Sequence, residues 1–193
     1  MRSDNLYALP ENLPIPTDDG AADHLPGAAV PPIILMSTQG RHVSLAEASL
    51  RGRVVVYCYP RTGQPDQDPA PGWDDVPGAR GCTPQSCGFR DKYDEYRTLG
   101  IELFGLSVQD TAYQRELAQR IHLPFEVLSD VNHDLTRAMG LPTFVIHGHT
   151  LLKRTTLVLH QGRVEKLFYP VFPPDRNAAE VLAWLHTNPT QST

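Results

Sequence analysis

Two cysteines five positions apart are the residues of this sequence best suited to chemistry. Cys82 and Cys87 lie in segment 81–91, where an irregular, proline-rich stretch gives way to a predicted helix. A thiol reacts as its thiolate, and the unpaired N–H groups of a helix N-terminus stabilise a negative charge placed there. We therefore expect Cys82 to be a reactive nucleophile and Cys87, one turn later, to trap its oxidised product.

The spacing also keeps the two thiols apart while the helix is formed. Five residues of α-helix rise by about 7.5 Å and place the two Cα atoms about 8.6 Å apart. A disulfide requires a Cα separation below roughly 7 Å. The pair is therefore predicted to bond only after the first helical turn unwinds. Spacing alone does not distinguish such a switch from two structural cysteines.

Composition limits the class of protein. The 193 residues, 40% hydrophobic and 20% charged, fit one compact domain. A formal charge of -5 without a dense cluster of basic residues argues against nucleic acid or an anionic membrane as the main partner. The chain shows neither a signal peptide nor an apolar run long enough to span a membrane, so we expect a soluble, cytoplasmic protein. Three cysteines do not suit a secreted disulfide scaffold, and Cys58 lies in a run typical of a buried strand.

The order of elements predicts an α/β fold. We expect an N-terminal extension, 1–27, a single domain, 28–187, and a C-terminal tail, 188–193. Within the domain, hydrophobic periodicity and turn residues predict strands at 33–36, 53–59, 101–108, 125–128, 155–160 and 163–169, and helices at 44–49, 83–100, 112–121, 132–139 and 176–187. Thr83 is the expected N-cap of the second helix. The result is a central mixed β-sheet flanked by helices, with Cys82 near the carboxyl end of a central strand, where ligands bind in such sheets.

Four segments of the sequence resemble one family of enzymes. They are VVVYCYP at 54–60, GCTPQSCGFRD at 81–91, GLSV at 105–108 and LPFEVLSD at 123–130. They are similar to the peroxiredoxins of the bacterioferritin comigratory protein, or peroxiredoxin Q, type, over about residues 28–187. The resemblance implies a thioredoxin-like fold and the reduction of hydrogen peroxide or organic hydroperoxides without a cofactor or metal. It further implies recycling by thioredoxin or a similar dithiol protein, in a monomer or homodimer.

The resemblance also assigns roles to particular residues. Cys82 matches the peroxidatic cysteine, and Cys87 matches the resolving cysteine that closes an intramolecular disulfide. Arg154 matches the arginine beside the peroxidatic sulfur, where a guanidinium favours the thiolate and holds the peroxide oxygens. Pro60 and Thr83 are assigned to the peroxide-binding pocket.

One part of the family pattern is missing. Family members carry Thr or Ser three positions before the peroxidatic cysteine, where this chain has Ala79. Pro60 lies 22 positions before Cys82, where the pattern has seven, so an insertion of about fifteen residues divides the motif within segment 60–81. We hypothesise that Thr62 supplies the hydroxyl; the alternative is an ordinary turn threonine. The insertion, which contains Trp73, Asp74 and Asp75, is expected to line the pocket, cover it as a lid or contact another subunit, and the sequence does not choose among these.

Two other functions remain open at this point. The first is a thioredoxin-fold disulfide reductase, suggested by Leu141-Pro142-Thr143-Phe144, although such enzymes separate their cysteines by two residues and this chain has four between them. The second is a copper-binding thioredoxin-like module. Cysteine and histidine ligate copper, and the histidines available to such a module are His133, His147 and His149.

Overall fold

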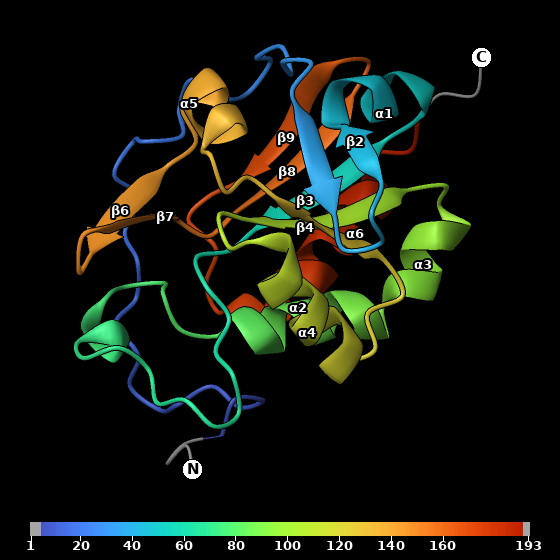
Figure 1. The fold of residues 1–193 in the computed structure, drawn as a ribbon. Coiled ribbons are helices and arrows are strands. Elements are labelled where there is room, and N and C mark those ends of the chain that lie inside the picture. Colours follow the sequence, from blue (N-terminus) through green and yellow to red (C-terminus); the bar gives the residue numbers. More distant parts are fainter. Residues whose placement is uncertain (1–4, 191–193) are drawn as a thin grey trace.

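A seven-stranded mixed sheet organises the protein, and the computed structural model describes residues 5–190 (Figure 1). The outer ends of the expected extension and tail, residues 1–4 and 191–193, lie outside the described residues. The strand order is β2-β1-β5-β4-β3-β8-β9, with β3, β4 and β5 parallel and the remaining pairs antiparallel. The strands are β1 (Ile34–Ser37), β2 (His42–Ser44), β3 (Val54–Cys58), β4 (Glu102–Ser107), β5 (Glu126–Ser129), β8 (Thr155–His160) and β9 (Arg163–Phe168).

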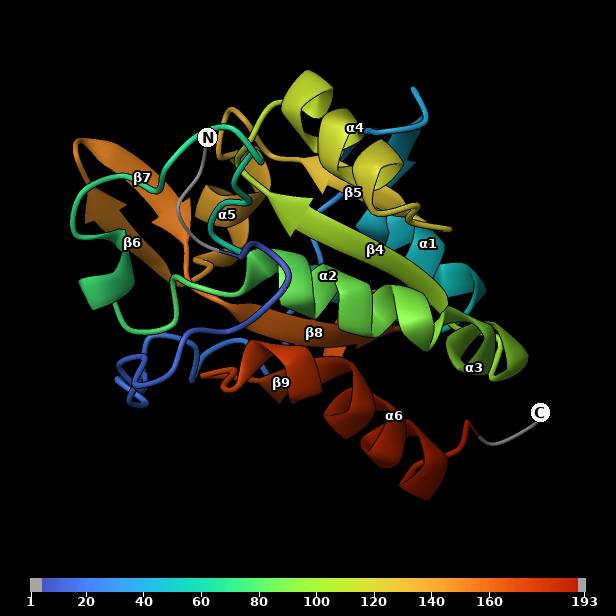
Figure 2. The same ribbon diagram turned by 90° about the horizontal axis from the view of Figure 1, so that it is seen from below.

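Helices cover both faces of this sheet, as the sequence predicts. Side chains of β3 alternate between two hydrophobic clusters, one that contains α1 and one that contains α2, α3 and α6. All five β3 residues are buried, which explains their unbroken apolar run. In Figure 2, α2 and α6 lie side by side on the face of the sheet that is turned toward the viewer. The helices are α1 (Leu45–Arg51), α2 (Cys82–Asp91), α3 (Tyr93–Thr98), α4 (Thr111–Arg120), α5 (Asp134–Met139) and α6 (Asn177–Thr187), with short 3₁₀ helices η1 (Trp73–Asp75) and η2 (Pro174–Arg176).

The prediction of one helix over 83–100 is wrong in two respects: the helix starts earlier, and a break divides it into α2 and α3. The helix begins at Cys82 with Gly81 as its N-cap, so Thr83 is not the cap. It ends at Asp91, because the backbone at Lys92 leaves the helical region (φ −106°, ψ 6°) before α3 begins. The break turns Tyr96 against the core, where its hydroxyl donates a hydrogen bond to the carbonyl of Ala178 at 2.7 Å.

A second, two-stranded sheet was not predicted. It consists of β6 (Thr143–Ile146) and β7 (His149–Leu152), joined by His147 and Gly148 with φ of 50° and 77°. Two consecutive left-handed residues make the tight turn that hairpins favour, but His-Gly is not one of the usual pairs for this turn. The sequence therefore gave no clear hairpin signal there. Among the described residues, no helix is both long and apolar enough to cross a membrane.

The residues before the sheet pack against the domain. Ala22 and Leu25 are buried in the core that contains α1. Asp19 accepts a hydrogen bond from the hydroxyl of Tyr169 at 2.6 Å and pairs with Lys153. These contacts hold the pKa of the Asp19 carboxyl well below its usual range. The N-terminal segment is thereby brought to the same end of the sheet as the loop that precedes α2 (Figure 1).

Candidate functional site

The first turn of α2 places Cys82 in a buried, positively polarised environment. Gly81 adopts φ +96°, and a Cβ atom there would lie 2.4 Å from Cγ of Pro174 and 2.6 Å from Cδ2 of Leu9. Only glycine therefore fits this position. Cys82 follows directly as the first helical residue, is 4% exposed, and points its sulfur toward the carbonyl of Ala79 at 3.6 Å. The helix N-terminus stabilises negative charge on this sulfur.

Arg154 provides a second positive charge at the sulfur. It lies between β7 and β8, is 3% exposed, and its Nη2 is 3.2 Å from Sγ of Cys82. The same nitrogen donates to the carbonyl of Arg80 at 3.0 Å. The guanidinium is permanently charged, and it is in hydrogen-bond contact with the sulfur. The structure thus brings together the two residues that the sequence placed 72 positions apart.

A buried chain of amides orients this guanidinium. Nη1 of Arg154 donates to the side-chain carbonyl of Gln85, and Nε2 of Gln85 donates to Oδ1 of Asn177 at 2.9 Å. Thr156 Oγ1 donates to the same oxygen at 2.7 Å. Sequence reasoning missed Gln85 and Asn177. Gln85 carried a usable signal, since it lies one helical turn after Cys82, whereas Asn177 carried none.

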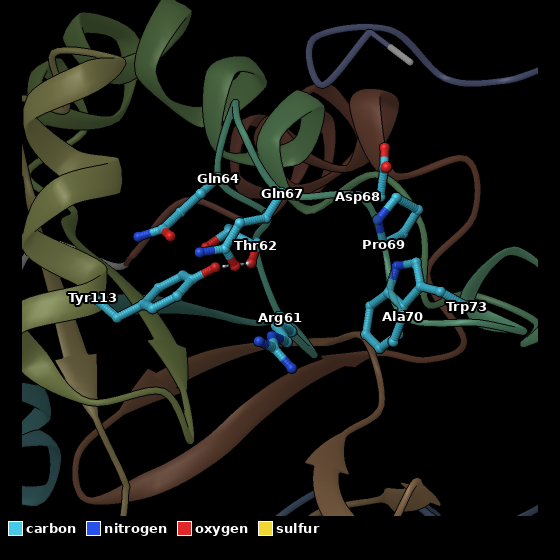
Figure 3. A pocket seen from close by; sticks show the side chains of 10 residues that line it. Arg61, Thr62, Gln64, Gln67, Asp68, Pro69, Ala70, Trp73 and Tyr113 are labelled. Atoms are coloured by element: carbon cyan, nitrogen blue, oxygen red, sulfur yellow. Dashed lines mark hydrogen bonds between the residues drawn. The ribbon is translucent and has the colours of Figure 1, made fainter. Parts of the chain in front are cut away.

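Thr62 is fixed by partners from α4 and from the loop between β4 and α4. It is 1% exposed, and its backbone N–H and its hydroxyl both donate to Oε1 of Gln109, at 2.9 and 3.1 Å. The hydroxyl of Tyr113, on α4, donates to the carbonyl of Thr62 at 3.0 Å, as Figure 3 shows. Burial raises the pKa of the Tyr113 phenol. Thr62 is therefore an ordered residue and not a solvent-facing turn threonine.

A small cavity joins Thr62 to Cys82. We call it the sulfur cavity; its volume is about 30 Å³, and its walls include Thr62, Cys82, Thr83 and Trp73. Asn5, Leu6 and Ala8 of the N-terminal segment close another side.

Pro60 and Arg154 do not line the sulfur cavity. Pro60 is buried just after β3, and Arg154 instead borders a separate groove of about 460 Å³. The structure therefore places Cys82, Thr62 and Thr83 around the sulfur cavity. Arg154 contacts the Cys82 sulfur but does not line this cavity.

The second cysteine of the pair lies on the same helix. Cys87 is half-buried, and burial raises the pKa of its thiol. All three cysteines are free thiols, with Cys82 and Cys87 both inside α2, so the predicted separation of the pair by helical geometry applies. Between them, Ser86 Oγ accepts a hydrogen bond from the hydroxyl of Tyr57 at 3.1 Å. Unwinding the first turn of α2 breaks the contact between Arg154 and Gln85.

Cys58 is a core residue, as its strand predicts. It is 1% exposed, and burial raises its pKa to about 12. The thiol is therefore protonated at neutral pH and poorly reactive.

The histidines considered for copper are not brought to the cysteines. Nε2 of His133 lies 3.1 Å from the carbonyl of Thr150, and Nε2 of His147 lies 2.8 Å from the carbonyl of Pro71. Within residues 5–190, no group of three or more histidine, cysteine or acidic side chains is placed to hold a metal ion.

The chain is similar to known proteins of one family. A family model described as Redoxin matches residues 25–182. The chain is 32% identical over 189 residues to a chloroplastic peroxiredoxin Q of Gentiana triflora, covering 94% of this chain and 78% of the relative. It is 34% identical over 163 residues to that of Oryza sativa subsp. japonica, covering 83% and 66% of the two chains.

Solved structures share the fold. Peroxidoxin BcpB from Mycobacterium tuberculosis superposes with a TM-score of 0.70 at 24% identity, covering 86% of this chain and 99% of that one. Peroxiredoxin Q of Xanthomonas campestris gives 0.65 at 20% identity, covering 91% and 98%. These neighbours confirm the predicted thioredoxin-like fold. The chain therefore belongs to the peroxiredoxins of the peroxiredoxin Q or bacterioferritin comigratory protein type, and it is a thiol-dependent peroxidase.

Proposed function

We propose that this peroxidase works through Cys82, with Cys87 as its resolving partner and Arg154 as the group that favours the thiolate. The observation that carries the proposal is the 3.2 Å contact between Nη2 of Arg154 and Sγ of Cys82 at the first turn of α2. A helix N-terminus and a guanidinium both act on one buried sulfur there. Cys58 lacks both features, and Cys87 lies in the middle of the helix.

The oxidative step transfers one oxygen atom to Cys82. Its thiolate attacks the terminal oxygen of a hydroperoxide, the S–O bond forms as the O–O bond breaks, and the leaving oxygen takes up a proton to give water or an alcohol. The products are a Cys82 sulfenic acid and the reduced peroxide. Thr62 and Thr83 face the space in which the peroxide would bind, and the Thr62 hydroxyl replaces the one that Ala79 lacks.

The resolving step forms an intramolecular disulfide. The first turn of α2 unwinds, the Cys87 sulfur attacks the sulfenic sulfur, and water leaves. A dithiol protein such as thioredoxin then reduces the disulfide and is itself oxidised, which restores both thiols. We propose hydrogen peroxide and organic hydroperoxides as substrates. A cytoplasmic location and a monomer or homodimer remain predictions.

Mass spectrometry of the protein after one equivalent of hydrogen peroxide tests the assignment. We expect a Cys82–Cys87 disulfide in the parent, and sulfenic then sulfinic acid on Cys82 in Cys87→Ser. Cys82→Ser is expected to consume no peroxide, whereas the matched control Cys58→Ser should behave as the parent does. Oxidation confined to Cys58, or a Cys82→Ser variant with full activity, contradicts the proposal.

A further inference from the structure

The inserted segment builds a second space directly beside the sulfur cavity. This space, which we call the loop chamber, has a volume of about 180 Å³ and is lined by Tyr113 and by residues of the segment from Arg61 to Trp73. Four residues line both the loop chamber and the sulfur cavity, namely Arg61, Thr62, Gly63 and Trp73. The two spaces are therefore neighbours that share a wall.

The two spaces differ greatly in capacity. A cavity of about 30 Å³ holds roughly two water-sized groups, because one water needs about 10–15 Å³ measured in this way. The sulfur cavity therefore accommodates hydrogen peroxide or the –OOH group of a larger molecule, but not an organic substituent as well. Such a substituent must continue into a neighbouring space.

The side opposite the loop is covered by the N-terminal segment. Asn5, Leu6 and Ala8 line the sulfur cavity, and a Cβ atom on Gly81 would touch Leu9. Arg120 of α4 binds both the N-terminal segment and the inserted segment. Its Nη1 donates to the Tyr7 hydroxyl at 3.3 Å, and its Nη2 donates to the carbonyl of Gly63 at 3.1 Å. With the N-terminal segment in place, the sulfur cavity adjoins the larger loop chamber on its other side, across the residues that line both spaces.

The walls of the loop chamber indicate what it binds. Figure 3 shows Gln64, Gln67, Thr62 and Tyr113 on one side, and the apolar groups of Pro69, Ala70 and Trp73 on the other. Trp73 is 8% exposed and is supported by Phe144, with ring centroids 6.3 Å apart. A compact alkyl or aryl group fits against this apolar side, whereas a long acyl chain exceeds the volume of about 180 Å³.

We infer that the loop chamber is the subsite for the organic group of a hydroperoxide whose –OOH occupies the sulfur cavity. The inference rests on the proposed function of Cys82 and deepens it by naming the preferred substrates. These are hydroperoxides with a compact, branched or aromatic substituent, such as tert-butyl or cumene hydroperoxide. Hydroperoxides of long-chain fatty acids are predicted to be poorer substrates. Trp73, which borders both spaces, is the residue at the junction.

Direct measurement of peroxide consumption, with dithiothreitol as reductant, tests this subsite without assuming a protein reductant. The quantity of interest is the ratio of kcat/KM for cumene hydroperoxide to kcat/KM for hydrogen peroxide. Ala70→Trp fills the chamber and should lower this ratio at least tenfold. Gln67→Trp, at an exposed position, should also lower the ratio, and it serves as the test if Ala70→Trp does not fold. Leu50→Trp, on α1 and 68% exposed, is the matched control and should keep the parent's ratio.

The outcomes separate this inference from the proposed function. If the parent reduces both peroxides but neither tryptophan variant lowers the ratio, the inference is wrong and the proposed function stands. The inference is also wrong if Leu6→Ala changes the ratio while the tryptophan variants do not, because the organic group then extends past the N-terminal segment. A parent that prefers linoleic acid hydroperoxide to cumene hydroperoxide also overturns the inference. A parent that reduces no peroxide overturns both.

Discussion

Gln85 accepts a hydrogen bond from Arg154 with its side-chain carbonyl, and it does so from the first turn of α2. The same turn carries Cys82, which Arg154 contacts with its other terminal nitrogen. One guanidinium is therefore bound to two residues of the turn that must unwind before the disulfide can form. Unwinding removes both partners from a buried cation, so this contact contributes to keeping α2 folded until the sulfur has been oxidised.

Replacing Gln85 with leucine should disturb the orientation of Arg154. Nη1 would lose its partner in a buried site where Nε has none among residues 5–190, at a cost of about 1–3 kcal/mol of stability. We expect kcat/KM for hydrogen peroxide to fall at least tenfold and the midpoint of thermal unfolding to decrease. Gln85→Glu keeps an acceptor at this position and should recover most of the catalytic loss. Equal activity of Gln85→Leu and the parent would show that Gln85 has no positioning role.

Replacing Arg154 itself should affect catalysis more strongly. Arg154→Lys keeps a charge but loses the planar fork that reaches Cys82 Sγ and Gln85 together, so we expect kcat/KM to fall by about 10²–10³-fold. Steady-state kinetics measure this, and far-UV circular dichroism checks that the variant is folded. A folded Arg154→Lys enzyme within threefold of the parent would contradict the assigned role. Lys153→Arg, at the neighbouring position, is the matched control.

Local patterns predicted most of the sheet, and long-range contacts account for what they missed. Strand β8 has its predicted bounds because a two-residue turn, Gln161-Gly162, follows it, and both turn residues have left-handed φ. By contrast, Asn177 meets Gln85 across 92 positions, and no local pattern reports such a contact. The break at Lys92 is equally invisible, since the residues around it favour helix and tertiary packing decides.

In the candidate site, too, some residues could be predicted from the sequence and others could not. Cys82 and Cys87 could be named from the sequence because the motif around them is contiguous, and Arg154 could be named only through the family resemblance. The partners of Thr62 could not, because the insertion separates it from Cys82 and its hydrogen bonds go to Gln109, 47 positions away. Gly81 was recognised as part of the motif, yet its left-handed conformation as the N-cap of α2 followed only from the structure.

The rate of disulfide formation should increase with pH. Burial raises the pKa of Cys87 above its ordinary value of 9.0 while α2 is folded. Below that ordinary value both the folded and the unwound helix hold the protonated thiol, so Cys87 does not alter the stability of the turn with pH. Above it, the unwound state loses its proton first, and the folded turn becomes less stable as pH rises. The larger thiolate fraction of Cys87 at higher pH also accelerates its attack on the sulfenic sulfur.

Single-turnover stopped-flow measurements between about pH 6 and pH 9.5 would test this dependence. The phase that follows sulfenic acid formation should accelerate across the range, and Cys58→Ser should show the same profile as the parent. A phase that slows at alkaline pH would mean that proton loss from Cys87 does not assist resolution.

Cys58 should resist alkylation in the native protein. Its pKa of about 12 leaves it protonated at pH 8, and it is 1% exposed. Brief treatment with iodoacetamide, followed by peptide mapping, should leave Cys58 unmodified, whereas all three cysteines should react in guanidinium chloride. Modification of Cys58 at a rate similar to that of Cys82 would contradict the assignment of the reactive thiol.

Thr62 provides the sharpest test of how the insertion preserves the active site. Its hydroxyl donates to Gln109 Oε1 at 3.1 Å, and Thr62 lines the cavity shared with Cys82, so its oxygen is placed to accept a hydrogen bond from the O–H of a peroxide. Thr62→Val keeps the shape and removes the hydroxyl, and we expect kcat/KM for hydrogen peroxide to fall about tenfold, the value of one hydrogen bond of roughly 1.5 kcal/mol. Thr62→Ser keeps the hydroxyl and should remain within threefold of the parent. If Thr62→Val matched the parent while staying folded, the hydroxyl that Ala79 lacks would have to come from Thr83, the other threonine that lines the cavity.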